Sequence, residues 1–190
     1  MKILAIRGSN IASLSGSFEV DFERPPLSGA GLFAITGPTG AGKSTLLDVL
    51  CLALFGETPR VSEAGSLKVP VTGAPDAGGQ SLTAKDARNL LRRGAAEGHA
   101  EVEFLGSDGR RYRAVWKVRR SRGQATGNIQ NASRSLWRRD GDDETPVADG
   151  LDETNERVPE VLGLSFDQFR KAVLLAQGDF AAFLRAKEKE

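Results

Sequence analysis

The sequence predicts an α/β domain in which a glycine-rich loop joins a strand to a long apolar helix. Residues 32–36 are mostly apolar and predict the strand, residues 37–42 are rich in glycine, and residues 43–55 predict the helix. Apolar residues lie on nearly every face of this helix, which is typical of a helix packed against a sheet. The chain has 190 residues, of which 39% are hydrophobic, and this is enough for one full domain.

A short apolar run and three runs of alternating apolar and polar residues predict four further strands. The first two are residues 2–7 and residues 17–22, where Phe18, Val20 and Phe22 alternate with acids. Residues 99–105 and residues 111–120 form the second pair and predict an antiparallel hairpin. On the return strand of that hairpin Tyr112 and Trp116 share one face, so we expect both rings to lie in the core.

Helical patterns and one irregular stretch complete the chain. Residues 56–82 contain many glycines and prolines and predict an irregular insertion. Helices are predicted at residues 84–92 and 151–162. A further helix begins at Ser165, where Gln168 stands three residues on, as in a capping box.

Composition excludes several classes of protein. The single cysteine, Cys51, excludes an internal disulfide framework. Arg7 interrupts the first apolar run well before the length of a signal-peptide core. The longest apolar run, residues 49–55, is far below the roughly 20 residues of a membrane span. We therefore expect a protein with no membrane partner, located in the cytoplasm and associated with the nucleoid if it acts on DNA.

The glycine-rich loop matches the complete phosphate-binding P-loop pattern, Gly37-x-x-x-x-Gly42-Lys43-Ser44, between a predicted strand and a predicted helix. Its backbone N–H groups and the helix N-terminus would surround phosphate oxygens. Lys43 would reach the β- and γ-phosphates as a catalytic residue, and the Ser44 hydroxyl would bind Mg²⁺. The predicted nucleotide-binding residues are Gly37, Pro38, Thr39, Gly40, Ala41, Gly42, Lys43, Ser44 and Thr45.

Hydrolysis of ATP needs further groups that this chain does not provide in the usual pattern. The second motif of P-loop ATPases is four apolar residues followed by an acid. Residues 173–176 are apolar, but Gln177 follows them and Asp179 comes two positions too late. The missing acid has to come from elsewhere.

Two separate stretches resemble a known family. Residues 33–60, which include the P-loop, and residues 174–184, which include Gln177 and Gly178, closely resemble the N-terminal ATPase segment of bacterial SbcC. SbcC is the large subunit of the SbcCD exonuclease and is related to the SMC proteins. The resemblance spans the whole chain, although residues 62–149 match only loosely.

The resemblance implies a P-loop NTPase fold of the ABC type, with a mixed sheet and an antiparallel β-hairpin subdomain. Residues 1–178 would be the N-terminal lobe of an ATPase head, and residues 179–190 would begin a coiled-coil helix. Gln177 would be the glutamine of the family's Q-loop, a catalytic residue that helps to hold Mg²⁺ and to position the attacking water. His99 does not match the family's switch histidine, and Ala12 stands where many relatives carry arginine.

The resemblance also implies partners. The C-terminal half of the same head would supply the acids and the signature loop, and a second head would complete each ATP site. Phosphodiester cleavage would belong to a nuclease subunit resembling SbcD. The cofactors implied are ATP and Mg²⁺.

The net charge of +1 conceals two blocks of opposite sign. Residues 110–139 contain ten Lys and Arg and no acid, whereas residues 140–160 contain nine acids and one Arg. An arginine-rich hairpin is suited to binding the phosphates of double-stranded DNA without sequence preference. The alternative is a solvated hairpin whose arginines pair with the acidic block. The predicted DNA-binding face consists of Arg111, Arg113, Lys117 and Arg119.

We therefore expect the ATP-binding half of an ATPase subunit that controls a partner nuclease in DNA end processing, repair and recombination. A structural SMC-like or RecF-like clamp, which uses ATP to embrace DNA without a nuclease, is the alternative. A small P-loop kinase is a third hypothesis, which ATPase activity of this chain alone would favour.

Overall fold

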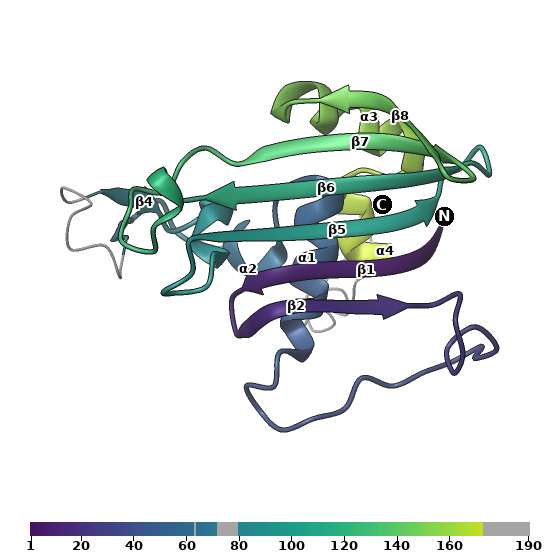
Figure 1. The fold of residues 1–190 in the computed structure, drawn as a ribbon, viewed down its shortest axis with the longest axis horizontal. Helices are drawn as coiled ribbons and strands as arrows, with labels where there is room; N and C mark the ends of the chain where they lie inside the picture. The colour runs from purple at the N-terminus through teal and green to yellow at the C-terminus, as the bar shows by residue number, and fades with distance from the viewer. Residues whose placement is uncertain (63, 72–79, 173–190) are drawn as a thin grey trace, which may run out of the picture.

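The computed structural model describes residues 1–62, 64–71 and 80–172, and within them a six-stranded sheet carries helices on one face (Figure 1). The strand order is β2-β1-β5-β6-β7-β8, and a separate pair, β3-β4, forms a small second sheet. In chain order the elements are β1 (Lys2–Ile11), β2 (Leu14–Asp21), α1 (Lys43–Phe55), α2 (Pro59–Ser62), β3 (Lys68–Pro70), β4 (Ser81–Thr83), the 3-10 helix η1 (Ala87–Leu90), β5 (Glu97–Leu105), β6 (Arg111–Arg119), the 3-10 helix η2 (Ser121–Gly123), β7 (Ser133–Asp140), β8 (Asp143–Asp149), α3 (Leu151–Leu162) and α4 (Phe166–Ala172).

The predicted hairpin forms the middle of the large sheet. β5 and β6 pair antiparallel from Glu97 opposite Arg119 to Leu105 opposite Arg111. Tyr112 and Trp116 are buried on the face toward the helices, which confirms that both rings belong to the core. The expected mixed sheet is not found in the described residues, where every strand pairing is antiparallel.

Helix α1 fills the space beneath the inner face of this sheet. Every residue from Val49 to Leu54 is buried, together with Thr45 and Asp48. Burying one such aliphatic side chain contributes about 1.5–3 kcal/mol. The prediction of a helix packed against a sheet is therefore confirmed.

A buried arginine holds the C-terminal end of α1. Arg134 comes from the inner face of β7 and is only 2% exposed. Its Nη2 donates hydrogen bonds to the carbonyl oxygens of Ala53 (3.2 Å) and Leu54 (2.8 Å), and its Nη1 donates to Asn155 of α3. A cation at this end of a helix also matches the helix dipole. Burial lowers the pKa of Arg134 to about 10. One side chain thus ties together α1, β7 and α3.

The helices that follow the sheet form largely as predicted. α3 includes Pro159 and ends at Gly163, whose φ of 73° is left-handed. The capping box before α4 is confirmed, because the Ser165 N–H donates to Gln168 Oε1 and the Gln168 N–H donates to Ser165 Oγ. Around residues 84–92 only the short η1 is present. In the described part, no helix is both long and apolar enough to cross a bilayer.

The strand predicted immediately before the P-loop is not formed. Residues 32–36 have no strand assignment, and Figure 1 shows this part of the chain as a long loop beside β2. Leu32 is 92% exposed, Phe33 49% and Ile35 47%. A strand needs a neighbour for its backbone groups. Among the described residues no strand pairs with this segment, so its apolar pattern alone does not make it a strand.

Two strands of the large sheet were not predicted. β7 and β8 add a hairpin at the edge of the sheet, with Leu136 opposite Ala148 on the buried face. The signal in the sequence is the Asp140-Gly141 pair, a strong hairpin turn, and Gly141 has the left-handed φ of 67° that such turns use. Within the insertion predicted at residues 56–82, the described residues form α2, β3 and β4.

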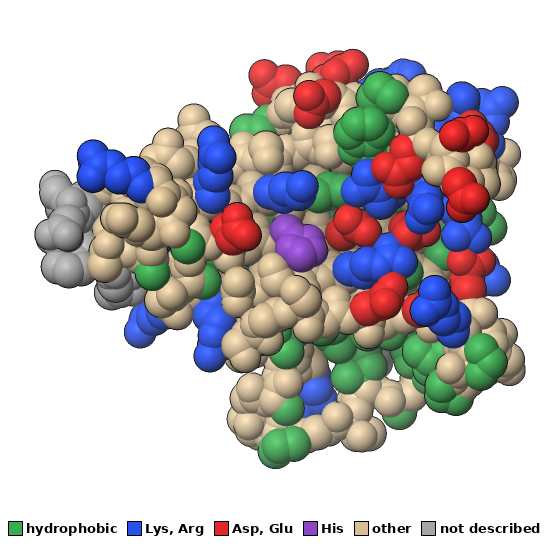
Figure 2. Space-filling view, viewed as in Figure 1, with side chains coloured by type: hydrophobic (Ala, Val, Ile, Leu, Met, Phe, Trp, Pro, Cys, Tyr) green, Lys and Arg blue, Asp and Glu red, His purple; other side chains and the backbone are tan. Residues whose placement is uncertain are grey.

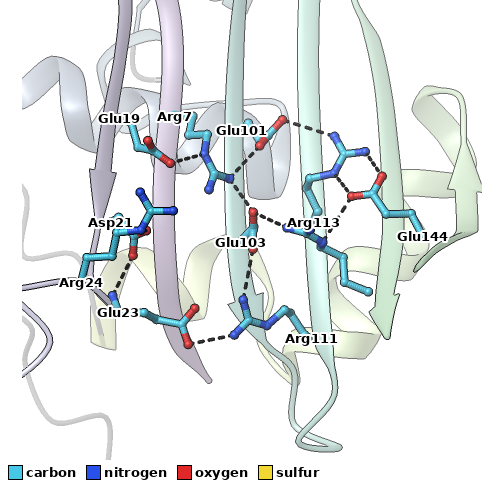
Figure 3. Close-up of polar contacts among 11 residues, drawn as sticks. Arg7, Glu19, Asp21, Glu23, Arg24, Glu101, Glu103, Arg111, Arg113 and Glu144 are labelled. Atoms are coloured by element: carbon cyan, nitrogen blue, oxygen red, sulfur yellow. Dashed lines mark hydrogen bonds and ion pairs between the residues drawn. The ribbon is translucent and has the colours of Figure 1, made fainter. Parts of the chain in front are cut away.

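The outer face of the sheet is covered by alternating positive and negative side chains (Figure 2). Glu103 of β5 lies at the centre with only 4% of its side chain exposed, and it pairs with Arg7 and Arg111 (Figure 3). It also pairs with Arg139 of β7 at 2.8 Å. Glu101 pairs with Arg7 at 3.0 Å. Carboxylates of β5 thus neutralise arginines of the neighbouring strands.

Glu103 holds three arginines from three strands, so we predict that Glu103→Gln lowers the free energy of unfolding by about 2 kcal/mol. This is less than the loss for a fully buried pair, because the arginines keep contact with water. Glu19→Gln is the matched control, since Glu19 also pairs with Arg7 but is 44% exposed, and it should cost less than about 1 kcal/mol. Urea unfolding measures both values, and equal losses would contradict a central role for Glu103.

Candidate nucleotide-binding site

The P-loop lies at the N-terminal end of α1, directly before its first residue, Lys43. Gly40 and Gly42 have φ values of 86° and 94°, which residues with a side chain rarely adopt. Gly42 caps α1 without a side-chain hydrogen bond, and the first turn of α1 contains no acid. Among the described residues no side chain accepts a hydrogen bond from the backbone N–H groups of this turn, so the positive end of the helix is available to an anion.

Lys43 is folded back along the loop. Its Nζ donates hydrogen bonds to the carbonyl oxygens of Gly37 (2.7 Å) and Pro38 (2.9 Å). These contacts place the ammonium group inside the curve of the loop, where the phosphates of a nucleotide are bound in P-loop proteins. Ser44 follows on the helix and is exposed, so its hydroxyl oxygen is open to a hard cation such as Mg²⁺.

The turn between β1 and β2 packs against the other side of the loop. The Ser13 hydroxyl lies 3.0 Å from the Thr45 hydroxyl, and either group can donate the hydrogen bond. A Cβ placed on Gly42 would lie 2.5 Å from Cδ2 of Leu14, so the Leu14 side chain would have to move. The left-handed φ of 94° also strains any residue with a side chain, and glycine is therefore strongly favoured at the last loop position.

An ion pair between a buried carboxylate and a half-exposed arginine lies one turn further along α1. Asp48 Oδ2 and Arg60 Nη2 are 2.8 Å apart, and Asp48 is only 4% exposed. Burial raises the pKa of Asp48, while Arg60 and the Thr58 hydroxyl oppose that shift. The pair ties α2 to the helix that carries the P-loop.

The structure brings the predicted nucleotide-binding residues together in one loop and helix end. They are Gly37, Pro38, Thr39, Gly40, Ala41, Gly42, Lys43, Ser44 and Thr45. Gln177 lies outside the described residues, as does the start of the coiled-coil helix predicted at 179–190. Ser13 and Leu14 were not predicted for this site. No local pattern marks them, because they precede Thr45 and Gly42 by about 30 positions and meet them only in the fold.

The four residues predicted to bind DNA lie on the outer face of the sheet, opposite the core side chains of β6, as the alternation predicted. Two of them are neutralised: Arg111 pairs with Glu23 and Glu103, and Arg113 pairs with Glu101 and Glu144. The hydrogen bond from Arg113 lowers the pKa of Glu144. The alternative interpretation, in which the arginines of the hairpin pair with acids, therefore applies to Arg111 and Arg113. Most of these acids lie outside residues 140–160.

Lys117 and Arg119 differ from the other two. Both are exposed, and within the described residues neither forms an ion pair. They line a hollow of about 720 Å³ together with His99, Gln130 and Asn131. Burial lowers the pKa of His99, and its Nδ1 lies 2.8 Å from the Ser9 hydroxyl. Lys117 and Arg119 thus leave open positive charge at one end of β6.

A P-loop at the start of a helix buried under a sheet defines a nucleotide-binding P-loop domain. The chain belongs to the AAA domain family, whose model matches residues 5–190. It is 56% identical to SbcC of the nuclease SbcCD from Pseudomonas aeruginosa and 52% identical to the same subunit from Rhodobacter capsulatus. Both matches cover 100% of this chain but only 15% of the length of the relative.

Comparison with solved structures supports the same fold. A structure from work on ATP-driven dimerization and DNA-stimulated activation of SMC ATPases superimposes with a TM-score of 0.57. The match covers 99% of this chain and 93% of the other, at 15% sequence identity. The likeness shows that the chain has the fold of an SMC-type ATPase domain, as the resemblance to SbcC implied.

Lys43→Ala removes the side-chain ammonium that lies inside the loop, so we predict that it weakens binding of a fluorescent ATP analogue by about 10- to 100-fold. Lys68→Ala is the control, because Lys68 is exposed on the small second sheet and should leave the affinity unchanged. A titration followed by fluorescence measures both. Unchanged affinity in Lys43→Ala would exclude the P-loop as the nucleotide site.

Proposed function

We propose that this chain is the nucleotide-binding N-terminal part of the ATPase subunit of an SbcCD-like DNA repair complex. The observation that carries the proposal is the P-loop, which is built on a buried helix in a chain 56% identical over its whole length to an SbcC protein. ATP binding and hydrolysis would control the access of a partner nuclease to DNA ends. The complex would act in the cytoplasm, at the nucleoid.

Different groups of the loop would contact different parts of the Mg²⁺–ATP complex. The backbone N–H groups of residues 37–45 would hold the phosphates, and Lys43 would leave its carbonyl partners to bind the β- and γ-phosphates. The Ser44 hydroxyl would ligate Mg²⁺, with Gln177 as a second oxygen ligand. When bound, the cation would neutralise charge on the phosphates. Gln177 would also orient the attacking water.

Hydrolysis would need a completing half and a second head. The segment before the P-loop exposes Leu32, Phe33 and Ile35, and Leu47 on α1 is 38% exposed. Phe33 contacts only the ring of Phe22 among the described aromatic residues, with centroids 5.2 Å apart. Exposed apolar side chains clustered next to a ligand site favour burial by another protein segment. We assign that role to the C-terminal half of the same head.

Association with a nuclease tests the proposal. The full-length protein should co-purify with an SbcD-like, metal-dependent phosphoesterase, and it should hydrolyse ATP in a reaction that Lys43→Ala abolishes. Robust ATPase activity without any such partner would favour the DNA clamp. Transfer of phosphate to a small-molecule acceptor would instead identify a kinase.

DNA would bind at the open end of β6 rather than across the whole basic hairpin. Lys117 and Arg119 keep their charge available beside a hollow, whereas Arg111 and Arg113 are held by carboxylates. Contacts of this kind bind the phosphates of either strand and do not depend on the base sequence.

The double variant Lys117→Glu/Arg119→Glu should weaken binding of a DNA duplex and lower the slope of log affinity against log salt by about 2. Arg110→Glu/Arg138→Glu changes the net charge equally, but these residues pair locally with Asp108 and Asp140. This control should have the smaller effect. Fluorescence anisotropy at several salt concentrations measures both variants of the full-length protein, and equal losses would contradict a defined DNA site.

A further inference from the structure

The turn between β1 and β2 is held in place by the segment that follows η1. The Ala12 N–H donates to the Leu90 carbonyl oxygen at 2.7 Å, and the Arg92 N–H donates to the Asn10 carbonyl oxygen at 2.9 Å. Ile11 and Leu91 form an isolated antiparallel bridge between these contacts. The backbone of the turn is therefore fixed by a segment about 80 residues further along the chain.

The side chain of Arg92 adds a second set of contacts. Its Nη1 donates to the carbonyl oxygens of Ala12 (3.2 Å) and Ser13 (2.8 Å). One guanidinium nitrogen thus bridges the two residues that form the corner. Hydrogen bonds from a charged donor are the stronger kind. Arg93, the next residue, is exposed and makes no such contact within the described part of the chain.

The turn has a backbone conformation that needs such support. Asn10 and Ala12 have φ values of 53° and 46°, in the left-handed region that residues with a side chain rarely occupy. Conformations of this kind persist where the surroundings hold them, and they gather at functional sites. Here the turn contacts the P-loop, because Ser13 meets the Thr45 hydroxyl and Leu14 fills the space beside Gly42.

The Thr45 side chain has few alternatives to Ser13. Thr45 is only 2% exposed, and it lies in the first turn of α1 directly after Lys43 and Ser44. A buried hydroxyl without a partner is costly, so the hydrogen bond to Ser13 fixes the rotamer of Thr45. The start of α1 is thereby held at a set distance from the turn.

We propose that Arg92 and Ser13 are positioning residues of the nucleotide site. Arg92 holds the strained turn, and the turn holds Thr45 through Ser13 and Gly42 through Leu14. The loop is thus shaped for phosphate before the nucleotide arrives. The proposal rests on the proposed function, because it assumes that the P-loop binds ATP. It assigns no contact between either residue and the nucleotide.

The test measures affinity for a fluorescent ATP analogue with Mg²⁺ in the full-length protein. Ser13→Ala should weaken binding about three- to tenfold, and Ser13→Thr, which keeps the hydroxyl, should restore it. Arg92→Ala should weaken binding about tenfold, with Arg92→Lys in between. Ser15→Ala and Arg93→Ala are the matched controls, since both residues are exposed neighbours without contacts to the loop.

A double-mutant cycle separates positioning from a general loss of stability. In a Thr45→Val background, Ser13→Ala should have no further effect on affinity, because its partner hydroxyl is already absent. Urea unfolding without nucleotide should show nearly equal stability for Ser13→Ala and Ser13→Thr. Wild-type affinity in Ser13→Ala, or full additivity with Thr45→Val, would overturn the proposal. If the unmodified protein binds no nucleotide, the proposed function itself fails.

Discussion

Helix α1 lies buried from Val49 to Leu54 beneath the sheet, and contacts at both of its ends depend on that placement. At the C-terminal end, the carbonyl oxygens of Ala53 and Leu54 accept hydrogen bonds from the buried Arg134. At the N-terminal end, Gly42 and Thr45 lie against the β1–β2 turn. The hydrophobic contacts fix the axis of the helix, and the polar contacts at its ends set where the P-loop points. A shift of α1 along the sheet would disturb both ends together.

The two faces of the sheet accommodate charged side chains in different ways. The inner face accommodates the buried guanidinium of Arg134, because helix carbonyl oxygens accept its hydrogen bonds. On the outer face several arginines lie close together, and the carboxylates of Glu101 and Glu103 compensate their positive charge. A count of charge along the sequence overstates the basic surface, since acids from distant strands lie between the arginines. Charge that stays open, as on Lys117, is the part that attracts a polyanion from solution.

The features predicted correctly from the sequence are those encoded by neighbouring residues. The helix that follows the P-loop, the capping box at Ser165 and the β5–β6 hairpin each depend on a pattern of neighbouring residues. Residues 32–36 show the limit of such patterns, because an apolar run becomes a strand only beside another strand. The contact between Ser13 and Thr45 and the pairing of Arg7 with Glu103 join positions far apart in the chain. No periodicity or spacing indicates them, and only the strand order brings them together.

The exposed apolar segment and the P-loop are one continuous piece of chain, and this has a physical consequence for assembly. The exposed segment that contains Leu32, Phe33 and Ile35 leads directly into Gly37, the first residue of the loop. Any surface that buries these side chains therefore also fixes the backbone that enters the loop. The other side of the loop is already held by the β1–β2 turn. On the proposed assembly, docking of the completing half would remove the remaining freedom of the loop, and the entropy of ordering it would be lost before ATP binds. Partner docking and nucleotide binding would then favour each other, and this coupling would need no contact between the partner and the phosphates.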